Sequence, residues 1–311
     1  MKALQIMKPY EFKIVEVPNP TPKDDEVVVK LEYAAICNQN DYKIFYGEYG
    51  DLIKYPMDPG AFGHEGVGLV DQVGKKVKSL KKGDRVIMTG DGGPMLYSEF
   101  VLRKADSVVS VDKKIPVKET AILELFGCGY HCLEHLDVKN KEIGLAGLGP
   151  AGLAILQLLM LRKPKKVIGI EISKERAAEA ARFGLKEVVS PLDEPAFKQL
   201  KKTGVDIVID CTGVPQSMLN SFDVTRREVM IFGFTNKKFE VDQSKWFQKE
   251  LIIRNTKVQT IDDLKAVVKL LEAGKISGKE FISGVDTFEN YAQVVEKIYK
   301  KEAIKILMEW R

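Results

Sequence analysis

The sequence predicts an α/β protein of two domains, in which a β-rich part precedes a doubly wound parallel sheet. The length of 311 residues favours two domains over one. Short apolar runs separated by Gly and Pro fill the chain up to about residue 113, and strand and helix patterns alternate after about residue 117. A glycine-rich turn at residues 147–152 stands where an expected strand gives way to an expected helix.

The β-rich part contains four short apolar runs that are typical of strands. Gly and Pro residues lie between these runs and favour turns. Short strands and turns at this spacing predict a compact barrel. The expected strands are residues 27–31, 66–70, 84–88 and 98–102.

The second part begins with a helical pattern over residues 117–136. The alternation of strands and helices that follows predicts a parallel sheet with helices on both faces. Strands are expected at 143–146, 166–170, 187–189, 205–210 and 229–232, and helices at 150–161 and 174–183. Amphipathic helices at 261–273 and 288–300 and a closing strand at 304–310 are expected to complete the chain.

Composition and charge limit the class of function. The net charge of +4 is small, and Lys, Asp and Glu are interleaved, which indicates a solvated surface and no nucleic-acid interface. The N-terminus lacks an apolar signal core and no apolar run is long enough for a membrane span, so we expect no membrane partner. The four cysteines are too few and too scattered for a disulfide framework, which favours the cytoplasm.

The turn Gly147-Leu148-Gly149-Pro150-Ala151-Gly152 predicts a dinucleotide site, because it joins an expected strand to an expected helix. The first Gly permits the tight turn, the second lets the backbone approach a pyrophosphate, and the third lets helix and strand pack closely. The pyrophosphate would lie at the helix N-terminus, where unpaired N–H groups favour an anion. A purely structural turn is the alternative, and the context favours the dinucleotide.

An acidic residue, Glu171, follows the next expected strand at about the expected distance of 20 residues. Together with Ile172 beside it, Glu171 would contact the adenosine ribose, and its charge would repel a 2′-phosphate. We therefore expect NAD to be preferred. Lys174 and Arg176 partly offset the repulsion, so NADP remains possible.

Cys37, His64 and Glu65 are candidate ligands of a catalytic zinc ion, since thiolate, imidazole and carboxylate all bind Zn²⁺. Such a site leaves one position for water or substrate, and the metal stabilises negative charge on an alcohol oxygen. The glycines that follow in Gly63-His64-Glu65-Gly66-Val67-Gly68 would keep the chain closely packed around the site.

Further residues are candidates for the surroundings of the metal. Glu124 would bind zinc directly or hold the zinc-bound water, with Cys128 a minor rival, and Asp41 would orient the imidazole of His64. A single Cys or His is more often a packing residue than a ligand. His131 and His135 share helical i,i+4 spacing, but without an acidic partner between them we predict no metal site there.

In their order and spacing these motifs resemble the zinc-dependent medium-chain dehydrogenase/reductase family. The resemblance implies a GroES-like β-barrel catalytic domain at residues 1–123 and 255–311 and a Rossmann NAD(P)-binding domain at 124–254. It also implies a homodimer or homotetramer that transfers a hydride between NAD(P) and a secondary alcohol, a polyol or sugar. The matching segments are residues 16–20, 27–30, 35–37, 41–47, 63–70, 83–86, 98–100, 147–152, 171, 176 and Asp210-Cys211-Thr212-Gly213, whose last three residues would contact the cofactor.

The sequence departs from the family pattern in two places. The segment Cys37-Asn38-Gln39-Asn40-Asp41 is one residue longer, and Asn40 stands nearest the place of the hydroxyl that relays the alcohol proton. Because Asn is neither acid nor base, the proton would leave through Glu65, Glu124 or a water chain. No cysteine lies between Arg85 and Ser98, so we predict no structural zinc.

Two alternative functions remain at this stage. One is a zinc-free NAD(P)H quinone or enoyl reductase of the same fold, which would explain the missing hydroxyl but leaves Cys37, His64 and Glu65 without a role. The other is a catalytically inactive nucleotide-binding protein. Variable loops at residues 42–55 and 91–95 are expected to line the substrate pocket.

Overall fold

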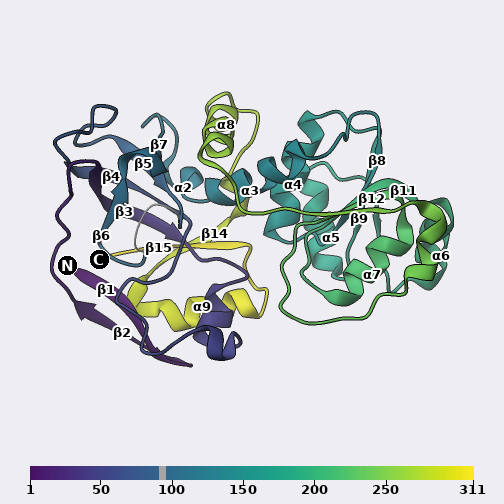
Figure 1. Cartoon of the computed structure of the whole chain (residues 1–311), viewed down its shortest axis with the longest axis horizontal. Coiled ribbons are helices and arrows are strands. Elements are labelled where there is room, and N and C mark those ends of the chain that lie inside the picture. The colour runs from purple at the N-terminus through teal and green to yellow at the C-terminus, as the bar shows by residue number, and fades with distance from the viewer. Residues whose placement is uncertain (91–95) are drawn as a thin grey trace. The chain divides into compact units, whose positions relative to one another are not determined.

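The computed structural model describes residues 1–90 and 96–311, which form two compact units (Figure 1). The first unit comprises Met1–Leu125 and Leu264–Arg311, and the second comprises Phe126–Asp263. These limits differ from the predicted domains mainly over residues 255–263, and the predicted domain boundaries stay a prediction. The expected pocket loop 91–95 lies outside the described residues.

The first unit is built on a seven-stranded sheet in the order β14-β15-β3-β4-β5-β7, with β6 also paired to β3. A separate antiparallel hairpin, β1–β2, precedes it in the chain. The strands are β1 (Lys2–Lys8), β2 (Glu11–Glu16), β3 (Glu26–Ala35), β4 (Gly66–Val73), β5 (Arg85–Met88), β6 (Phe100–Lys104), β7 (Val108–Ser110), β14 (Ile282–Thr287) and β15 (Lys305–Glu309). The four predicted strands of this part are confirmed as β3, β4, β5 and β6.

Strand β3 is the centre of this sheet, because β4, β6 and β15 all pair with it antiparallel. Val27, Val28 and Val29 are each at most 1% exposed, so both faces of the strand are covered. An unbroken run of β-branched residues suits such a position. The run therefore predicted the strand correctly, while the pairing with β15 joins residues far apart in the sequence, such as Ala35 and Leu307.

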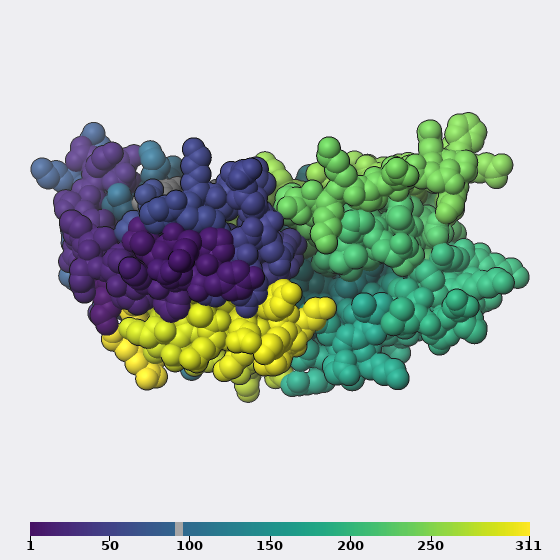
Figure 2. All heavy atoms as spheres, turned by 90° about the horizontal axis from the view of Figure 1, so that it is seen from below, coloured from purple at the N-terminus to yellow at the C-terminus, as the bar shows by residue number. Residues whose placement is uncertain are grey.

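The ends of the chain meet in the first unit. Figure 2 shows the C-terminal segment, in yellow, lying directly against the N-terminal segment, in purple. The Lys2 ammonium donates a hydrogen bond of 2.6 Å to the carbonyl oxygen of Arg311. A buried aromatic cluster fills the interior behind them, with Tyr97, Phe288 and Tyr291 each 0% exposed.

The helices associated with the first unit are short, and one prediction about them is wrong. The expected single helix over 117–136 is two helices, separated by a turn at Ala121 and Ile122, and Thr120 Oγ1 donates a 2.6 Å hydrogen bond to the carbonyl of Val117 within the first one. Tight i→i+3 bonds then turn the chain at Ala121 and Leu125. The helices are α1 (Asp41–Phe45), α2 (Val117–Thr120), α3 (Leu123–Glu134), α8 (Ile261–Glu272) and α9 (Tyr291–Tyr299), and α3 continues into the second unit.

The second unit contains a parallel six-stranded sheet in the order β10-β9-β8-β11-β12-β13. This is the strand order of a Rossmann sheet, with the reversal between β8 and β11, so the predicted doubly wound fold is confirmed. The strands are β8 (Glu142–Ala146), β9 (Lys166–Ile170), β10 (Val188–Val189), β11 (Val205–Asp210), β12 (Thr225–Ile231) and β13 (Ile252–Asn255). The helices are α4 (Pro150–Leu161), α5 (Lys174–Arg182), α6 (Glu194–Thr203) and α7 (Pro215–Val224).

Helix α6 illustrates an element that the sequence analysis missed. The Asp193 side chain accepts the N–H of Ala196 and caps the helix, and Pro195 lies in its first turn. Asp followed by an early Pro is a recognised helix start, so the signal was present. The hairpin, α7, β13 and β14 were missed as well. Among the described residues, no helix has the length and apolarity needed to cross a membrane.

Candidate metal and nucleotide sites

The register of β3 and β4 brings the predicted metal ligands together. Ala34 pairs with Gly66, and the N–H of Ala35 donates to the carbonyl of Glu65 at 2.8 Å. Cys37 follows the end of β3, and His64 and Glu65 precede the start of β4. Antiparallel pairing therefore places residues from positions 37 and 64–65 side by side at one end of the sheet.

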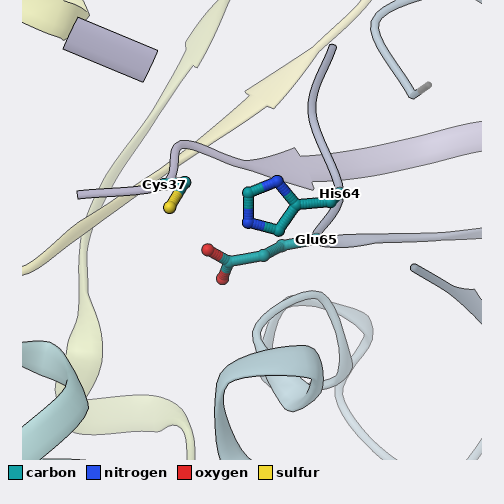
Figure 3. A group of neighbouring side chains, drawn as sticks. All are labelled: Cys37, His64 and Glu65. Carbon is teal, nitrogen blue, oxygen red and sulfur yellow. The ribbon is translucent and has the colours of Figure 1, made fainter. Parts of the chain in front are cut away.

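Cys37, His64 and Glu65 form the one group of three potential metal ligands found among the described residues. Their ligand atoms all lie within 4.8 Å of one another, and Figure 3 shows the three side chains pointing toward one another. Glu65 is 1% exposed, whereas Cys37 and His64 are half-buried. A partly buried group of thiolate, imidazole and carboxylate donors is the donor set of a catalytic zinc site.

Glu65 is held by a buried ion pair that the sequence analysis missed. The Lys305 ammonium lies 2.5 Å from Glu65 Oε1, and both side chains are 2% exposed. Lys305 also donates to the carbonyl of Ile36 at 3.1 Å. The other oxygen, Glu65 Oε2, is buried and has no hydrogen-bond partner among the described residues. Since an orphaned buried carboxylate oxygen is costly, this atom fits the role of a metal ligand.

The charged side chains around Cys37, His64 and Glu65 shift one another's pKa values. Burial lowers the pKa of His64, but the charge and hydrogen bond of Cys37, together with the charges of Glu124 and Glu65, raise it well above its ordinary value. Burial likewise lowers the pKa of Lys305, and the negative charges of Glu65 and Cys37 outweigh it, so the net shift is upward. The raised pKa values of His64 and Lys305 indicate that the negative charges of Cys37, Glu65 and Glu124 stabilise positive charge at this position.

Asp41 supports Cys37 through the backbone. Its Oδ2 accepts the N–H of Cys37 at 2.8 Å, and its Oδ1 accepts the hydroxyls of Tyr97 at 2.7 Å and Tyr291 at 3.0 Å. Burial raises the pKa of Asp41, and these hydrogen bonds and the charge of His64 oppose the rise. Asp41 therefore fixes the Cys37 loop, while its predicted role in orienting His64 stays a prediction.

The glycine before the His-Glu pair is required by packing. Gly63 has a φ of +85°, and a Cβ at this position would lie 2.2 Å from the ring of Tyr97. Gly68 allows similarly close contact, since a Cβ there would lie 2.3 Å from the carbonyl oxygen of Lys30. The expectation that the glycines after Glu65 keep the chain close-packed is confirmed at Gly68.

The loop after Cys37, which departs from the family pattern, is held by a hydrogen bond between Tyr49 and Asn40. The hydroxyl of Tyr49 donates a 2.6 Å hydrogen bond to Oδ1 of Asn40, the residue nearest the place of the missing relay hydroxyl. Burial, followed by the charges of Cys37 and Glu48, raises the pKa of Tyr49. Both residues belong to the stretch after Cys37 that includes the expected substrate loop 42–55.

In the second unit the predicted nucleotide residues gather at the carboxyl edge of the parallel sheet. Gly147–Gly152 follow β8, Glu171 follows β9, and Cys211–Gly213 follow β11. Gly147 has a φ of +85°, and a Cβ on Gly152 would lie 2.0 Å from the carbonyl oxygen of Gly147. The first and third glycines are therefore required by the turn and by close packing, as expected.

Glu171 holds the loop through its carboxylate. Oε2 accepts the N–H of Leu148 at 2.8 Å, and Oε1 accepts those of Ile172 at 2.9 Å and Ser173 at 3.0 Å. Because an ionised carboxylate has about four acceptor positions, one remains for a further donor. The guanidinium of Arg176 lies beside Gly149. A Cβ added to Gly149 would be 3.5 Å from its nearest nitrogen.

The third predicted segment is fixed by a buried aspartate. Asp210 is 0% exposed, and its Oδ1 accepts both the N–H of Thr212 at 2.9 Å and the hydroxyl of Thr212 at 2.7 Å. The turn continues through Gly213, which has a φ of +65°. Burial raises the pKa of the Cys211 thiol well above its ordinary value, so this thiol is protonated.

Glu124 and Cys128, the two other candidate metal ligands, lie outside the group of Cys37, His64 and Glu65. Glu124 is buried in the first turn of α3, and its charge reaches His64 and Lys305, but it is not part of the group whose ligand atoms lie within 4.8 Å. The Cys128 thiol donates to Oε1 of Gln259 at 2.7 Å. Lys305, Tyr97 and Tyr291 were missed. A lysine at the start of an otherwise apolar closing strand was the available signal for Lys305.

Two family models match this chain. Residues 150–273 match a zinc-binding dehydrogenase model, and residues 23–113 match an alcohol dehydrogenase GroES-like domain. The chain belongs to the zinc-dependent medium-chain dehydrogenase family. It is therefore an oxidoreductase of the zinc-binding dehydrogenase type, and the predicted GroES-like and Rossmann folds are confirmed.

Curated relatives and solved structures cover nearly the whole chain. D-arabinitol dehydrogenase 1 of Uromyces fabae is 27% identical over 98% of this chain and 96% of its own length. D-arabitol-phosphate dehydrogenase of Enterococcus avium is 25% identical over 96% and 94%. The structure of galactitol-1-phosphate dehydrogenase from Escherichia coli has a TM-score of 0.87 at 22% identity, with 99% of both chains covered. These findings support a dehydrogenase and neither of the two alternatives.

Proposed function

We propose that this protein oxidises a secondary alcohol of a polyol or sugar reversibly, with NAD as the hydride acceptor. The observation that carries the proposal is the convergence of ligand atoms of Cys37, His64 and Glu65 within 4.8 Å, together with the orphaned Oε2 of Glu65, in a chain that also holds a Rossmann nucleotide loop. A zinc-free quinone or enoyl reductase would have no use for this donor set. A catalytically inactive protein would have no need to preserve both sites.

Zinc would be held by Cys37, His64 and Glu65, one ion per chain at this site. When bound, zinc supplies a Lewis acid that stabilises negative charge on an alcohol oxygen. Lys305 holds Glu65 Oε1 and leaves Oε2 free for the metal, while Asp41 fixes the loop that carries Cys37. Glu124 is assigned to hold solvent near the site, because its charge reaches His64 from outside the ligand group.

The alcohol proton would leave through a carboxylate and water, not through Asn40. Asn40 offers no ionisable group, and its carbonyl oxygen is already bound by the hydroxyl of Tyr49. The raised pKa of Tyr49 keeps that phenol protonated, which makes it a donor and not a base. We assign this task to Glu124, a buried carboxylate whose charge acts on His64.

The substrate class rests on the relatives. Two curated relatives that cover almost the whole chain are named for D-arabinitol and for D-arabitol phosphate. Polyols carry secondary alcohols with neighbouring hydroxyls, which suits a metal that binds oxygen. We therefore propose five-carbon polyols and their phosphates as the first substrates to test.

The preference for NAD rests on Glu171. Its carboxylate is 8% exposed and keeps one acceptor position after binding three backbone amides, so a ribose hydroxyl can be accepted there. A 2′-phosphate beside the same carboxylate would be repelled. Arg176 lies close to Gly149, and its positive charge would weaken that repulsion without removing it.

A homodimer or homotetramer in a reducing compartment such as the cytoplasm completes the proposal. All four cysteines are free, which suits a reducing environment. Strand β13 is the last strand of the parallel sheet, and Ile253 on it is 43% exposed. An edge strand with an exposed apolar residue is a surface that a second copy can cover. Light scattering of the purified protein measures the oligomeric state.

The direct test of the metal assignment uses Cys37→Ser and His64→Ala in the zinc-loaded protein. We expect turnover with a polyol and NAD to fall by at least about 10³-fold, which corresponds to roughly 4 kcal/mol of lost transition-state stabilisation. NAD binding, measured by fluorescence, should be unchanged. Cys128→Ser is the matched control, because serine keeps the hydrogen bond to Gln259. Turnover retained in either ligand variant would remove these residues from the metal site.

A further inference from the structure

Two of the three histidines of the chain face each other at the end of α3. The Nε2 atoms of His131 and His135 are 3.3 Å apart, and the rings are nearly perpendicular, at 81° with centroids 4.8 Å apart. His131 is 9% exposed, whereas His135 is exposed. Spacing of i,i+4 places both on one face of the helix, and one of the two is open to solvent.

A carboxylate from a distant part of the chain completes this pair. Asp263 Oδ2 lies 2.9 Å from Nδ1 of His131 and also accepts the N–H and the hydroxyl of Thr260, at 2.8 and 2.6 Å. Thr260 Oγ1 accepts the N–H of Asp263 in return, so Asp263 is fixed by the capping of α8. The acidic partner that is missing beside the two histidines in the sequence is therefore supplied by residue 263.

The carboxylate fixes the tautomer of His131. An ionised carboxylate only accepts hydrogen bonds, so Nδ1 of His131 carries the proton that points at Asp263. In the neutral ring, Nε2 then presents a lone pair toward His135. A carboxylate on one ring nitrogen and a metal on the other is the usual arrangement of metal-binding histidines, because the carboxylate orients the ring and raises its basicity.

The separation of the two Nε2 atoms matches a shared metal ion. Two imidazole nitrogens at about 2.0–2.1 Å from a tetrahedral zinc ion lie about 3.3–3.4 Å apart. The observed separation is 3.3 Å. It is longer than the ~2.9–3.0 Å of a typical N–H···O hydrogen bond, so a direct bond between the rings would be weak.

We propose that His131 and His135 form a second site for a divalent transition-metal ion of the zinc type, with Asp263 orienting His131 and water filling the remaining positions. Imidazole ligands suit Zn²⁺, Cu²⁺ and Ni²⁺. The site lies entirely in the second unit and shares no residue with the group of Cys37, His64 and Glu65. With two protein ligands it binds metal more weakly than a three-ligand site and exchanges it with solvent.

The test follows the three imidazoles by NMR in the full-length, untagged protein labelled with ¹⁵N-histidine, during titration with Zn²⁺. Because the chain has three histidines, each ring gives its own signals. We expect the Nε2 signals of His131 and His135 to shift together and saturate, and His135→Ala to abolish the shift of His131. His135 is exposed, so this variant should fold normally. The His64 signal reports the other metal site separately.

The role of Asp263 has its own pair of variants. Asp263→Asn should weaken zinc binding at His131 and His135 about 10–100-fold. Asp262→Asn removes the same charge from the same turn of α8 at an exposed position, and it should leave the affinity unchanged. Rings of His131 and His135 that do not respond to Zn²⁺, or an unchanged affinity in His135→Ala, would show that the pair is only a structural contact and would overturn the proposal.

Discussion

In the first unit the candidate metal ligands lie just beyond the ends of two separate strands and are brought together by the pairing of β3 with β4, whereas in the second unit the nucleotide loop is one continuous segment, Gly147–Gly152. The metal group depends on side-chain charge, above all the buried pair of Glu65 and Lys305. The nucleotide loop depends on backbone shape. We therefore expect the metal group to be disrupted by changes of side-chain charge, and the nucleotide loop to be disrupted by an added methyl group.

The largest effect within this comparison is expected for Lys305→Met. Removing the ammonium leaves Glu65 buried and charged without its partner, which should lower the free energy of unfolding of the zinc-free protein by about 3–5 kcal/mol. Denaturant unfolding in the presence of a chelator measures this loss. Lys300→Met is the matched control, because the ion pair of Lys300 with Glu296 is more than half exposed and contributes little.

The double variant Glu65→Met/Lys305→Met distinguishes a role of the ion pair in metal binding from a role in stability. Replacing both partners by apolar residues should recover most of the stability, yet zinc binding at Cys37 and His64 should be weakened. This result would show that the ion pair is kept for the metal and not for the fold. A Lys305→Met variant no less stable than Lys300→Met would contradict the account of Glu65.

The backbone-built site is best broken by Gly152→Ala. A Cβ at this position would lie 2.0 Å from the carbonyl oxygen of Gly147, so the loop or α4 must move. Strain of this kind costs about 1–3 kcal/mol, and we expect the affinity for NAD to fall by about 10–100-fold. Titration calorimetry with NAD measures the change. Gly284→Ala, where the added Cβ has nothing within 4 Å, should bind NAD normally.

The smallest effect concerns the choice of nucleotide. Glu171→Gln keeps the size and one of the two accepting oxygens, and it removes the charge that would repel a 2′-phosphate. We expect the ratio of kcat/KM for NADP to that for NAD to rise about tenfold, which equals about 1.4 kcal/mol. Steady-state kinetics with both nucleotides measure the ratio. A wild-type protein that already uses NADP better than NAD would overturn the assignment of Glu171.

The two sites also differ in how far the sequence predicted them. The nucleotide loop was predicted with its strand, its helix Pro150–Leu161 and Glu171, because all of its determinants are local in sequence. For the metal group, the sequence named Cys37, His64 and Glu65 but not Lys305, Tyr97 or Tyr291. These three partners reach the site only through long-range pairing and packing, which no local pattern reports.

Prediction of the secondary structure was likewise limited to features that are local in the sequence. The strong apolar runs of β3 and β11 were predicted, whereas the break between α2 and α3 was not, since the turn at Ala121 and Ile122 contains no Gly or Pro that would mark it. The pair of His131 and His135 was dismissed for lack of an acidic partner. That partner, Asp263, lies 132 residues from His131 in sequence and is invisible without the fold.

We propose above that Cys37, His64 and Glu65 make this protein a zinc-dependent polyol dehydrogenase. The most direct test of this proposal is the rate of NADH formation from D-arabinitol and related polyols by the untagged protein, before and after treatment with a chelator and again after zinc is restored. We expect activity that is lost on chelation and recovered when zinc is restored. Activity that survives complete removal of zinc would contradict the proposal.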